Sequence, residues 1–151
     1  MLKKETARSL FVTIYPMNIF QKVKELNLPP GQYVVFGSGP LAAHSIRPTR
    51  DVDLFVTTAL YQQLKNEGWE EKGWPLTGGK YLSKDDLYEV DDTWHYGDYN
   101  PAPEAIIAVA DIMDGVPFAP LAEVLKWKKA FGRPKDLKDI ILIEQYESAR
   151  S

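Results

Sequence analysis

The sequence YVVFGSGPLAAHSIRPTRDVDLFV, residues 33–56, decides the fold, because it joins two apolar runs through a glycine turn. Residues 33–36 are β-branched or aromatic, which predicts a buried strand that enters the turn Gly37-Ser38-Gly39. The following residues, 41–46, have room for only a short helix, since Pro48 biases the residue before it away from helical conformation. The order predicted here is therefore strand, turn, short helix and a return to the sheet.

Two aspartates introduce the second predicted strand, residues 52–57. Asp51 and Asp53 are two positions apart, so strand alternation sends both carboxylates to one face and turns Val52 and Leu54 into the core. Two unpaired carboxylates would repel, whereas a divalent cation between them converts repulsion into coordination. The pair is thus a candidate site for Mg²⁺ or Mn²⁺. The simpler interpretation is a solvent-facing edge strand that happens to carry two acids.

The glycine turn upstream of the aspartates is a candidate phosphate site. Gly37 permits positive φ and a close approach, and exposed amides at the start of a helix attract phosphate oxygens. Ser38 adds a hydroxyl donor. Mg²⁺ usually bridges substrate phosphates to one or two carboxylates, so a phosphate turn facing an aspartate pair forms a coherent site.

The same glycines also allow a dinucleotide-binding interpretation. The segment Gly37-Ser38-Gly39-Pro40-Leu41-Ala42 satisfies the pattern Gly-x-Gly-x-x-Gly/Ala after a strand. That fold requires a full helix after the turn and one acidic residue about twenty positions further on. Here Pro48 shortens the helix, the acids come earlier, and two of them share a face. These departures favour the metal and phosphate site.

The rest of the chain predicts helices and strands around this stretch. Apolar spacing indicates helices over residues 16–27, 60–67, 104–110, 121–131 and 134–146. Residues 80–83 and 87–93 predict a hairpin around Lys84-Asp85-Asp86, and residues 116–118 predict an extended segment after the turn at Asp114-Gly115. No repeat or linker divides the chain, so we expect one domain over residues 1–151.

The composition restricts the chemistry. A formal charge of −3 leaves no global basic field, so a phosphate partner must be held by a local cluster or by metal ions. The absence of cysteine excludes disulfides and thiolate metal sites, and two distant histidines argue against a zinc cluster. No apolar segment reaches the length of a signal peptide or membrane span, so we expect a cytoplasmic protein without a membrane partner.

Phe36-Gly37-Ser38 with Asp51-Val52-Asp53-Leu54 resembles the signature of the nucleotidyltransferase superfamily that includes DNA polymerase beta. The sequences Lys126-Trp127-Lys128-Lys129 and Arg133-Pro134-Lys135-Asp136-Leu137-Lys138-Asp139 resemble the C-terminal part of its small bacterial and archaeal members. The resemblance covers residues 33–143. It implies an α/β (α+β) fold in which helices flank a mixed, twisted sheet and a C-terminal helical pair closes one side.

The resemblance also implies an activity. A nucleoside monophosphate would pass from a nucleoside triphosphate to an acceptor hydroxyl on an RNA end, a protein or a small molecule, with release of pyrophosphate. Asp51 and Asp53 would hold the metal. The implied nucleotide-binding residues are Gly37, Ser38, Arg50 and Lys128. The alternative is a non-catalytic member of the same fold that binds a partner or serves as a toxin–antitoxin module.

A third carboxylate is implied on a neighbouring strand, to activate the acceptor hydroxyl or to bind metal. Glu89 is the first choice, because Tyr88 and Val90 flank it in an apolar-acid-apolar pattern. Strand alternation nevertheless puts Asp91 on the same face. The sequence leaves this choice open.

Several other polar residues have simpler interpretations. Asp136 and Asp139 begin a predicted helix, and stabilisation of its N-terminus explains Asp136, so both are predicted to be structural. His44 is predicted to be a packing residue. Arg47 could reach a nucleotide phosphate, or it could be solvated or pair with Asp85 or Asp86.

Overall fold

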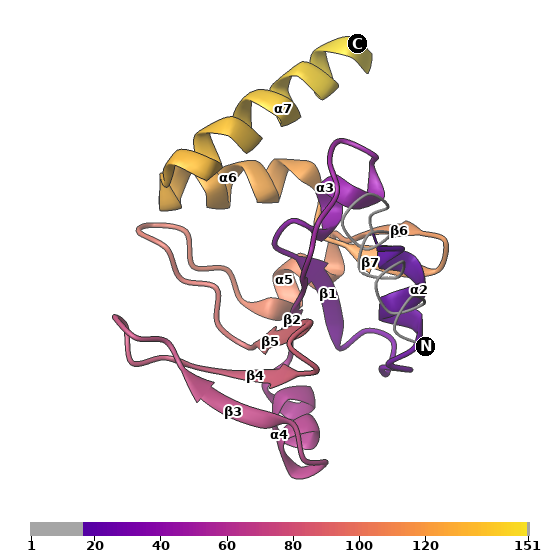
Figure 1. Cartoon of the computed structure of the whole chain (residues 1–151), viewed down its shortest axis with the longest axis vertical. Helices are drawn as coiled ribbons and strands as arrows, with labels where there is room; N and C mark the ends of the chain where they lie inside the picture. The colour runs from indigo at the N-terminus through magenta and orange to yellow at the C-terminus, as the bar shows by residue number, and fades with distance from the viewer. Residues whose placement is uncertain (1–16, 151) are drawn as a thin grey trace, which may run out of the picture.

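A mixed seven-stranded sheet with helices on both faces forms the centre of the structure, a computed structural model that describes residues 17–150 (Figure 1). In chain order the elements are α2 (Ile19–Lys24), β1 (Tyr33–Phe36), α3 (Gly39–Ala43), β2 (Val52–Val56), α4 (Thr58–Asn66), β3 (Glu70–Gly73), β4 (Lys80–Lys84), β5 (Tyr88–Asp91), α5 (Pro103–Ala108), β6 (Asp111–Met113), β7 (Val116–Phe118), α6 (Leu121–Phe131) and α7 (Pro134–Arg150). The predicted mixed α/β class is confirmed.

The strand order β3-β4-β5-β2-β1-β7-β6 places β1 and β2 at the centre of the sheet. Strands β1 and β2 pair antiparallel, whereas β5 lies parallel to β2 and β7 lies parallel to β1. The predicted hairpin is present as β4 and β5, joined by a turn in which Asp85 and Asp86 have positive φ. Aspartate adopts this conformation more readily than most residues.

The pairing of β1 with β2 removes the dinucleotide-binding interpretation. A dinucleotide-binding unit places its first two strands parallel, with a full helix between them. Here the two strands are antiparallel, and α3 has only 5 residues. Because the connection is so short, the chain returns beside β1 instead of crossing over the sheet.

Strands β3 and β6 were not predicted from the sequence. They occupy the two edges of the sheet, and β3 is made of Glu70, Glu71, Lys72 and Gly73. Its hydrogen bonds to β4 hold this charged segment extended, although its residues do not alternate between apolar and polar. Strand β6 is similarly short and largely exposed. Edge pairing is a tertiary effect that local sequence patterns miss.

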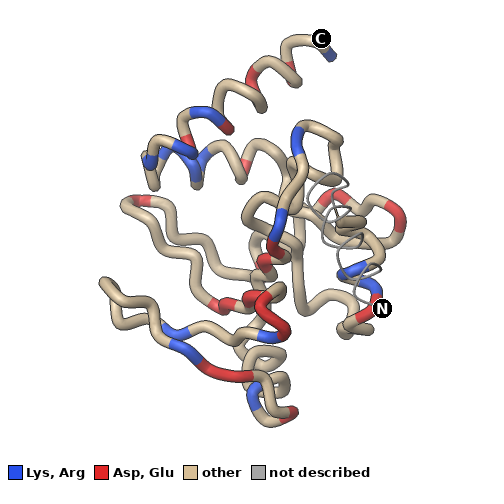
Figure 2. The backbone as a smooth tube through the Cα atoms, in the orientation of Figure 1, with Lys and Arg blue, Asp and Glu red and all other residues tan. Residues whose placement is uncertain are grey.

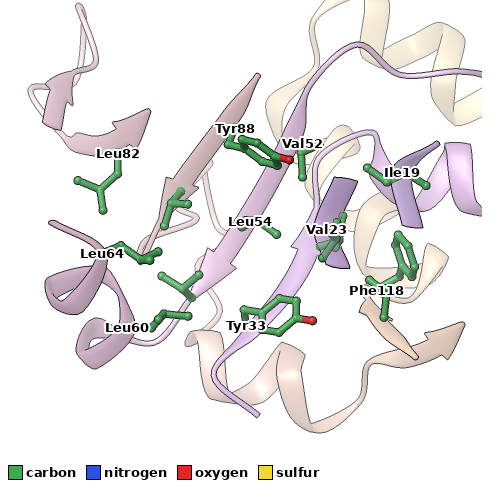
Figure 3. Packing of buried hydrophobic residues seen from close by; sticks show 14 of the residues in the cluster. Ile19, Val23, Tyr33, Val52, Leu54, Leu60, Leu64, Leu82, Tyr88 and Phe118 are labelled. Carbon is green, nitrogen blue, oxygen red and sulfur yellow. The ribbon is translucent and has the colours of Figure 1, made fainter. Parts of the chain in front are cut away.

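Two apolar cores lie on opposite faces of the sheet. Figure 3 shows the first, in which Ile19 and Val23 of α2 and Leu60 and Leu64 of α4 pack on strand residues such as Leu54. The second core joins the other face to α5, α6 and α7. Its buried members are Val34, Phe36, Leu41, Phe55, Trp94, Ile106, Ala119, Leu121, Val124, Trp127 and Ile143. The molecule therefore has three layers: helices, sheet, helices.

The helices follow the predicted order with shifted ends. Asn18 caps α2 by accepting a hydrogen bond from the Gln21 amide, so the helix begins at Ile19, and it ends at Lys24, short of the predicted range 16–27. Pro16 lies outside the described residues. Gly132 ends α6 at a φ of 70°. The following helix, α7, continues to Arg150, beyond the predicted residue 146. Across residues 17–150, no helix combines the length and apolar character that crossing a membrane requires.

Candidate active site

Asp53 lies in the middle of the sheet, at the end where β1 finishes and β2 begins. Its neighbours in register are Phe36 on β1 and Glu89 on β5. Alternation along β2 puts Asp53 on the same face as Phe55, which packs in the core beneath α6. Val52 and Leu54 are fully buried in the opposite core, as predicted. The acid therefore faces the layer of C-terminal helices.

The glycine turn touches Asp53 directly. Gly37 has a φ of +61°, and a Cβ at this position would overlap Asp53 Oδ2 and come within 2.8 Å of Asp53 Cβ. Any larger residue would displace either the carboxylate or the turn. Ser38 follows as the N-cap residue of α3. The predicted phosphate turn and the predicted acid are thus in contact.

The parallel register separates the two candidates for a third carboxylate. Glu89 pairs with Asp53, whereas Asp91 lies further along β5, beside Phe55. The Asp91 carboxylate accepts hydrogen bonds from Trp74 Nε1 at 3.2 Å and from the Thr93 amide at 3.1 Å. Glu89 is consequently the carboxylate nearer to the turn, and Asp91 already has two donors.

Burial raises the pKa of Asp53 well above its usual range, and Glu89 and Asp51 raise it further, while Lys128 opposes them. Asp53 Oδ1 is buried and has no hydrogen-bond partner among the described residues. A buried, unsatisfied carboxylate is costly. This oxygen is therefore suited to receive a proton or a cation.

Asp51 and Asp53 could supply some of the ligands of a hard divalent cation. Asp51 is exposed and immediately precedes β2, so it and Asp53 offer oxygen ligands of the kind that Mg²⁺ and Mn²⁺ prefer. Within residues 17–150, no group of three or more His, Asp or Glu side chains is arranged to hold a metal ion. A cation bound here would need further ligands from water or from substrate phosphates, which is the common arrangement for Mg²⁺.

A buried ion network lies between the C-terminal helices and the glycine turn. Lys128, 2% exposed on α6, contacts Asp139 Oδ2 at 2.8 Å and Asp136 Oδ1 at 3.3 Å, both on α7. Arg133 binds Asp136 through two nitrogens, at 2.7 and 2.9 Å. Arg47 binds Asp139 in the same way, at 2.7 Å for both contacts. The five charges together hold α7 against α6 and against the segment before β2.

Burial alone would raise the pKa values of Asp136 and Asp139. Hydrogen bonds from Arg133 outweigh this effect at Asp136, and those from Arg47 and Lys128 do so at Asp139, so both pKa values are lowered. Both aspartates are therefore structural ions, as predicted. The prediction from helix-end stabilisation found their role but missed their partners.

A sequence signal for the network existed. Asp136, Asp139 and Ile143 follow each other at helical spacing, as do Leu121, Val124 and Lys128, and all six are buried. A charge inside an apolar stripe is rarely tolerated unless it is paired. Opposite charges inside the stripes of two successive helices therefore indicate a buried ion pair.

The other residues considered from the sequence differ in their exposure and in their contacts. Arg50 is exposed in the segment that precedes Asp51. Lys128 influences the pKa of Asp53, but its ammonium group is paired with two aspartates. His44 is a packing residue whose Nδ1 lies 3.2 Å from the Tyr146 hydroxyl.

No family model, curated protein or solved structure matches the chain.

Proposed function

We propose that the chain is a metal-dependent nucleotidyltransferase, which moves a nucleoside monophosphate from a nucleoside triphosphate to an acceptor hydroxyl. The observation that carries the proposal is the contact of Gly37 with Asp53, beside Glu89 on the adjacent strand. One glycine turn, one acid with a buried carboxylate oxygen and one neighbouring acid thus meet at the end of a central strand. This is the juxtaposition that a phosphate site with metal ligands requires.

The residues have distinct proposed roles. Backbone amides of the Gly37 turn and the Ser38 hydroxyl bind phosphate oxygens, and exposed Arg50 adds positive charge. Asp51 and Asp53 hold Mg²⁺ or Mn²⁺, which when bound neutralises phosphate charge and orients the triphosphate. Lys128 contributes through its charge near Asp53, since its ammonium group is engaged by Asp136 and Asp139.

The proposed chemistry is an in-line displacement at the α-phosphorus. The acceptor oxygen forms a bond to that phosphorus while the bond to the oxygen that bridges to the β-phosphate breaks. Pyrophosphate leaves with the electron pair, and Glu89 accepts the hydroxyl proton. Most of the rate enhancement would come from positioning and charge neutralisation.

The arrangement of the elements supports a nucleotidyltransferase-type fold. A central strand leads into the glycine turn, the short helix α3 returns the chain to an antiparallel acidic strand, and a parallel strand carries the next acid. Helix α6 packs in the core on the Phe55 face of the sheet, and α7 packs against α6 (Figure 1). The acceptor class, whether an RNA end, a protein or a small molecule, stays a prediction.

Thermal unfolding with Mg²⁺ and each of the four common nucleoside triphosphates tests the proposal. Ligand at a hundredfold its Kd should raise the melting temperature of the native chain by roughly 5–10 °C. Asp53→Asn should abolish that increase. The matched control is Asp114→Asn in the exposed β6–β7 turn, remote from the glycine turn, which should keep it.

Label transfer then separates an enzyme from a binding module. Triphosphate labelled at the α-phosphate should place its label on an RNA, protein or small-molecule fraction only when Asp53 is intact. A melting shift without transfer to any fraction would favour the non-catalytic partner-binding or toxin–antitoxin module. If the native chain shows no shift with any triphosphate, the nucleotidyltransferase proposal is wrong.

A further inference from the structure

Arg47 connects the glycine turn to the C-terminal helices. Four of its five guanidinium hydrogens are engaged, by Asp139 Oδ1, Asp139 Oδ2, the Pro48 carbonyl and Ser38 Oγ. Its side chain is 31% exposed, so the group is held at the edge of the interior. No other residue type can offer these donors in one rigid plane.

The direction of the bond to Ser38 matters for phosphate binding. Arg47 Nη2 donates to Ser38 Oγ at 2.8 Å, and an arginine has no lone pair to accept in return. The serine oxygen therefore acts as the acceptor, and its own hydrogen remains available to another group. Beside a phosphate, that hydrogen would point to a phosphate oxygen.

The other side of Arg47 is anchored in the interior. Asp139 is 6% exposed and also contacts buried Lys128, so its carboxylate cannot rotate freely. The bidentate contact transmits that constraint to the guanidinium plane. Arg47, Lys128 and Arg133 oppose Asp136 and Asp139, three cations against two anions, so the network as a whole carries one net positive charge.

We propose that Arg47 is a positioning residue, which fixes the Ser38 hydroxyl as a donor to nucleotide phosphate and couples the turn to α6 and α7. The inference rests on the proposed nucleotide binding and deepens it. Docking of the C-terminal helices then becomes a condition for tight nucleotide binding, although those helices begin far along the chain.

A double-mutant cycle between Arg47 and Ser38 tests the inference. Arg47→Lys keeps a charge that can pair with Asp139 but lacks the fork that reaches Ser38 at the same time. Titration calorimetry with Mg²⁺ and the triphosphate that gives the largest melting shift should show roughly tenfold weaker binding for Arg47→Lys and for Ser38→Ala. The double variant should also be roughly tenfold weaker, not a hundredfold, because both changes remove one interaction.

Arg133→Lys is the matched control. It makes the same change at the far end of the network, where Arg133 binds Asp136 and does not reach Ser38. It should lower stability in urea about as much as Arg47→Lys while leaving nucleotide affinity within about twofold of the native value. This difference separates positioning of Ser38 from general stabilisation.

Three results would overturn the inference alone while nucleotide binding stands: native affinity in Arg47→Lys, additive losses in the double variant, or an equal loss of affinity in Arg133→Lys. If the native chain binds no triphosphate, the proposed function fails first, and the inference fails with it.

Discussion

At the scale of single residues, the position of Asp53 is unfavourable for stability. One of its oxygens is buried without a hydrogen-bond partner in the described part of the chain, and Glu89 adds a second acid next to it. An unsatisfied buried polar group costs about 1–3 kcal/mol, and a charged one costs more. A small apolar residue would be more stable here. Perturbed acids of this kind cluster at functional sites.

The register of β5 predicts which neighbouring acid takes the acceptor proton. Glu89→Gln should slow label transfer about 10²- to 10⁴-fold, because the amide cannot accept the proton. Asp91→Asn should slow it by less than about tenfold, since Asp91 lies beside Phe55 and is engaged by Trp74 and Thr93. Single-turnover label transfer to the acceptor fraction that the native chain labels measures both effects.

The two substitutions control for each other, because they change neighbouring same-face acids on one strand in the same way. A larger loss with Asp91→Asn than with Glu89→Gln would reverse the assignment. Equal and small losses would mean that neither acid serves as the base.

At the scale of elements, a charge network joins α6 to α7. In Figure 2, basic residues gather at the corner where the two helices meet. The network members Lys128, Asp136 and Asp139 are buried. A buried ion pair is not by itself stabilising, because desolvation offsets much of the attraction. The ion pairs instead require a specific packing of α6 against α7, since each buried charge must lie beside its partner.

Removing different members of this network should have unequal effects on stability. Lys128→Met leaves two bidentate pairs, Arg47 with Asp139 and Arg133 with Asp136, so the free energy of unfolding should change by less than about 1 kcal/mol. Asp139→Asn leaves Lys128 and Arg47 with too few anions and should cost about 3–5 kcal/mol. Urea unfolding monitored by tryptophan fluorescence measures both.

The control for this comparison is Glu144→Gln on the same helix. Glu144 pairs with Lys129 at 3.8 Å, and both side chains are more than half exposed, so its loss should stay within about 0.5 kcal/mol. If Lys128→Met destabilises the chain more than Asp139→Asn does, the charge balance described for the network is wrong.

At the scale of the whole molecule, titratable groups whose pKa values are shifted in opposite directions change the stability of the fold in opposite directions as the pH changes. Burial raises the pKa of Asp91 to about 6 from 3.8, so the folded state binds this proton more tightly than the unfolded state. Its contribution to stability is fully present below pH 3.8 and is lost as the pH rises through about 6. Asp53 acts in the same direction. Burial lowers the pKa of His44 from 6.5, so His44 acts against them as the pH falls.

The pH dependence of Asp91 is best measured as a difference between two chains. As the pH falls from 7 to 4, the native chain should gain up to about 3 kcal/mol of unfolding free energy relative to Asp91→Asn. Comparing native and variant cancels the contributions of His44 and Asp53. Urea unfolding at closely spaced pH values provides the measurement, and a difference that stays constant across this range would contradict the raised pKa.

Below pH 4, the protonation of Asp136 and Asp139 has the opposite effect and lowers stability. The pKa values of Asp136 and Asp139 are lowered from 3.8, so their stabilisation is present above that value and is lost as the pH falls through the lowered values. The native chain should therefore lose stability steeply there. Its loss should exceed that of Asp139→Asn, because the variant lacks one of the two titrating groups.

Much of this architecture follows from local patterns. Apolar runs and turn residues predicted β1 and β2, the β4–β5 hairpin and the two C-terminal helices close to their observed bounds, because these elements bury continuous stripes. The alternation of Asp51-Val52-Asp53-Leu54 also correctly predicted that Val52 and Leu54 are buried in the core. The edge strands β3 and β6 were missed, since their residues are exposed and extended only by pairing with a neighbour.

By itself, the sequence determined that a glycine turn and an acidic strand lie close together, since a short helix leaves the chain little room to separate them. Only the tertiary structure decided which acid accompanies Asp53, because Glu89 and Asp91 share a face and differ only in their register with β2. It also decided that Arg47 and Lys128 meet Asp139, on segments far apart along the chain. Strand register and helix docking are set by packing between distant segments, which no local periodicity records.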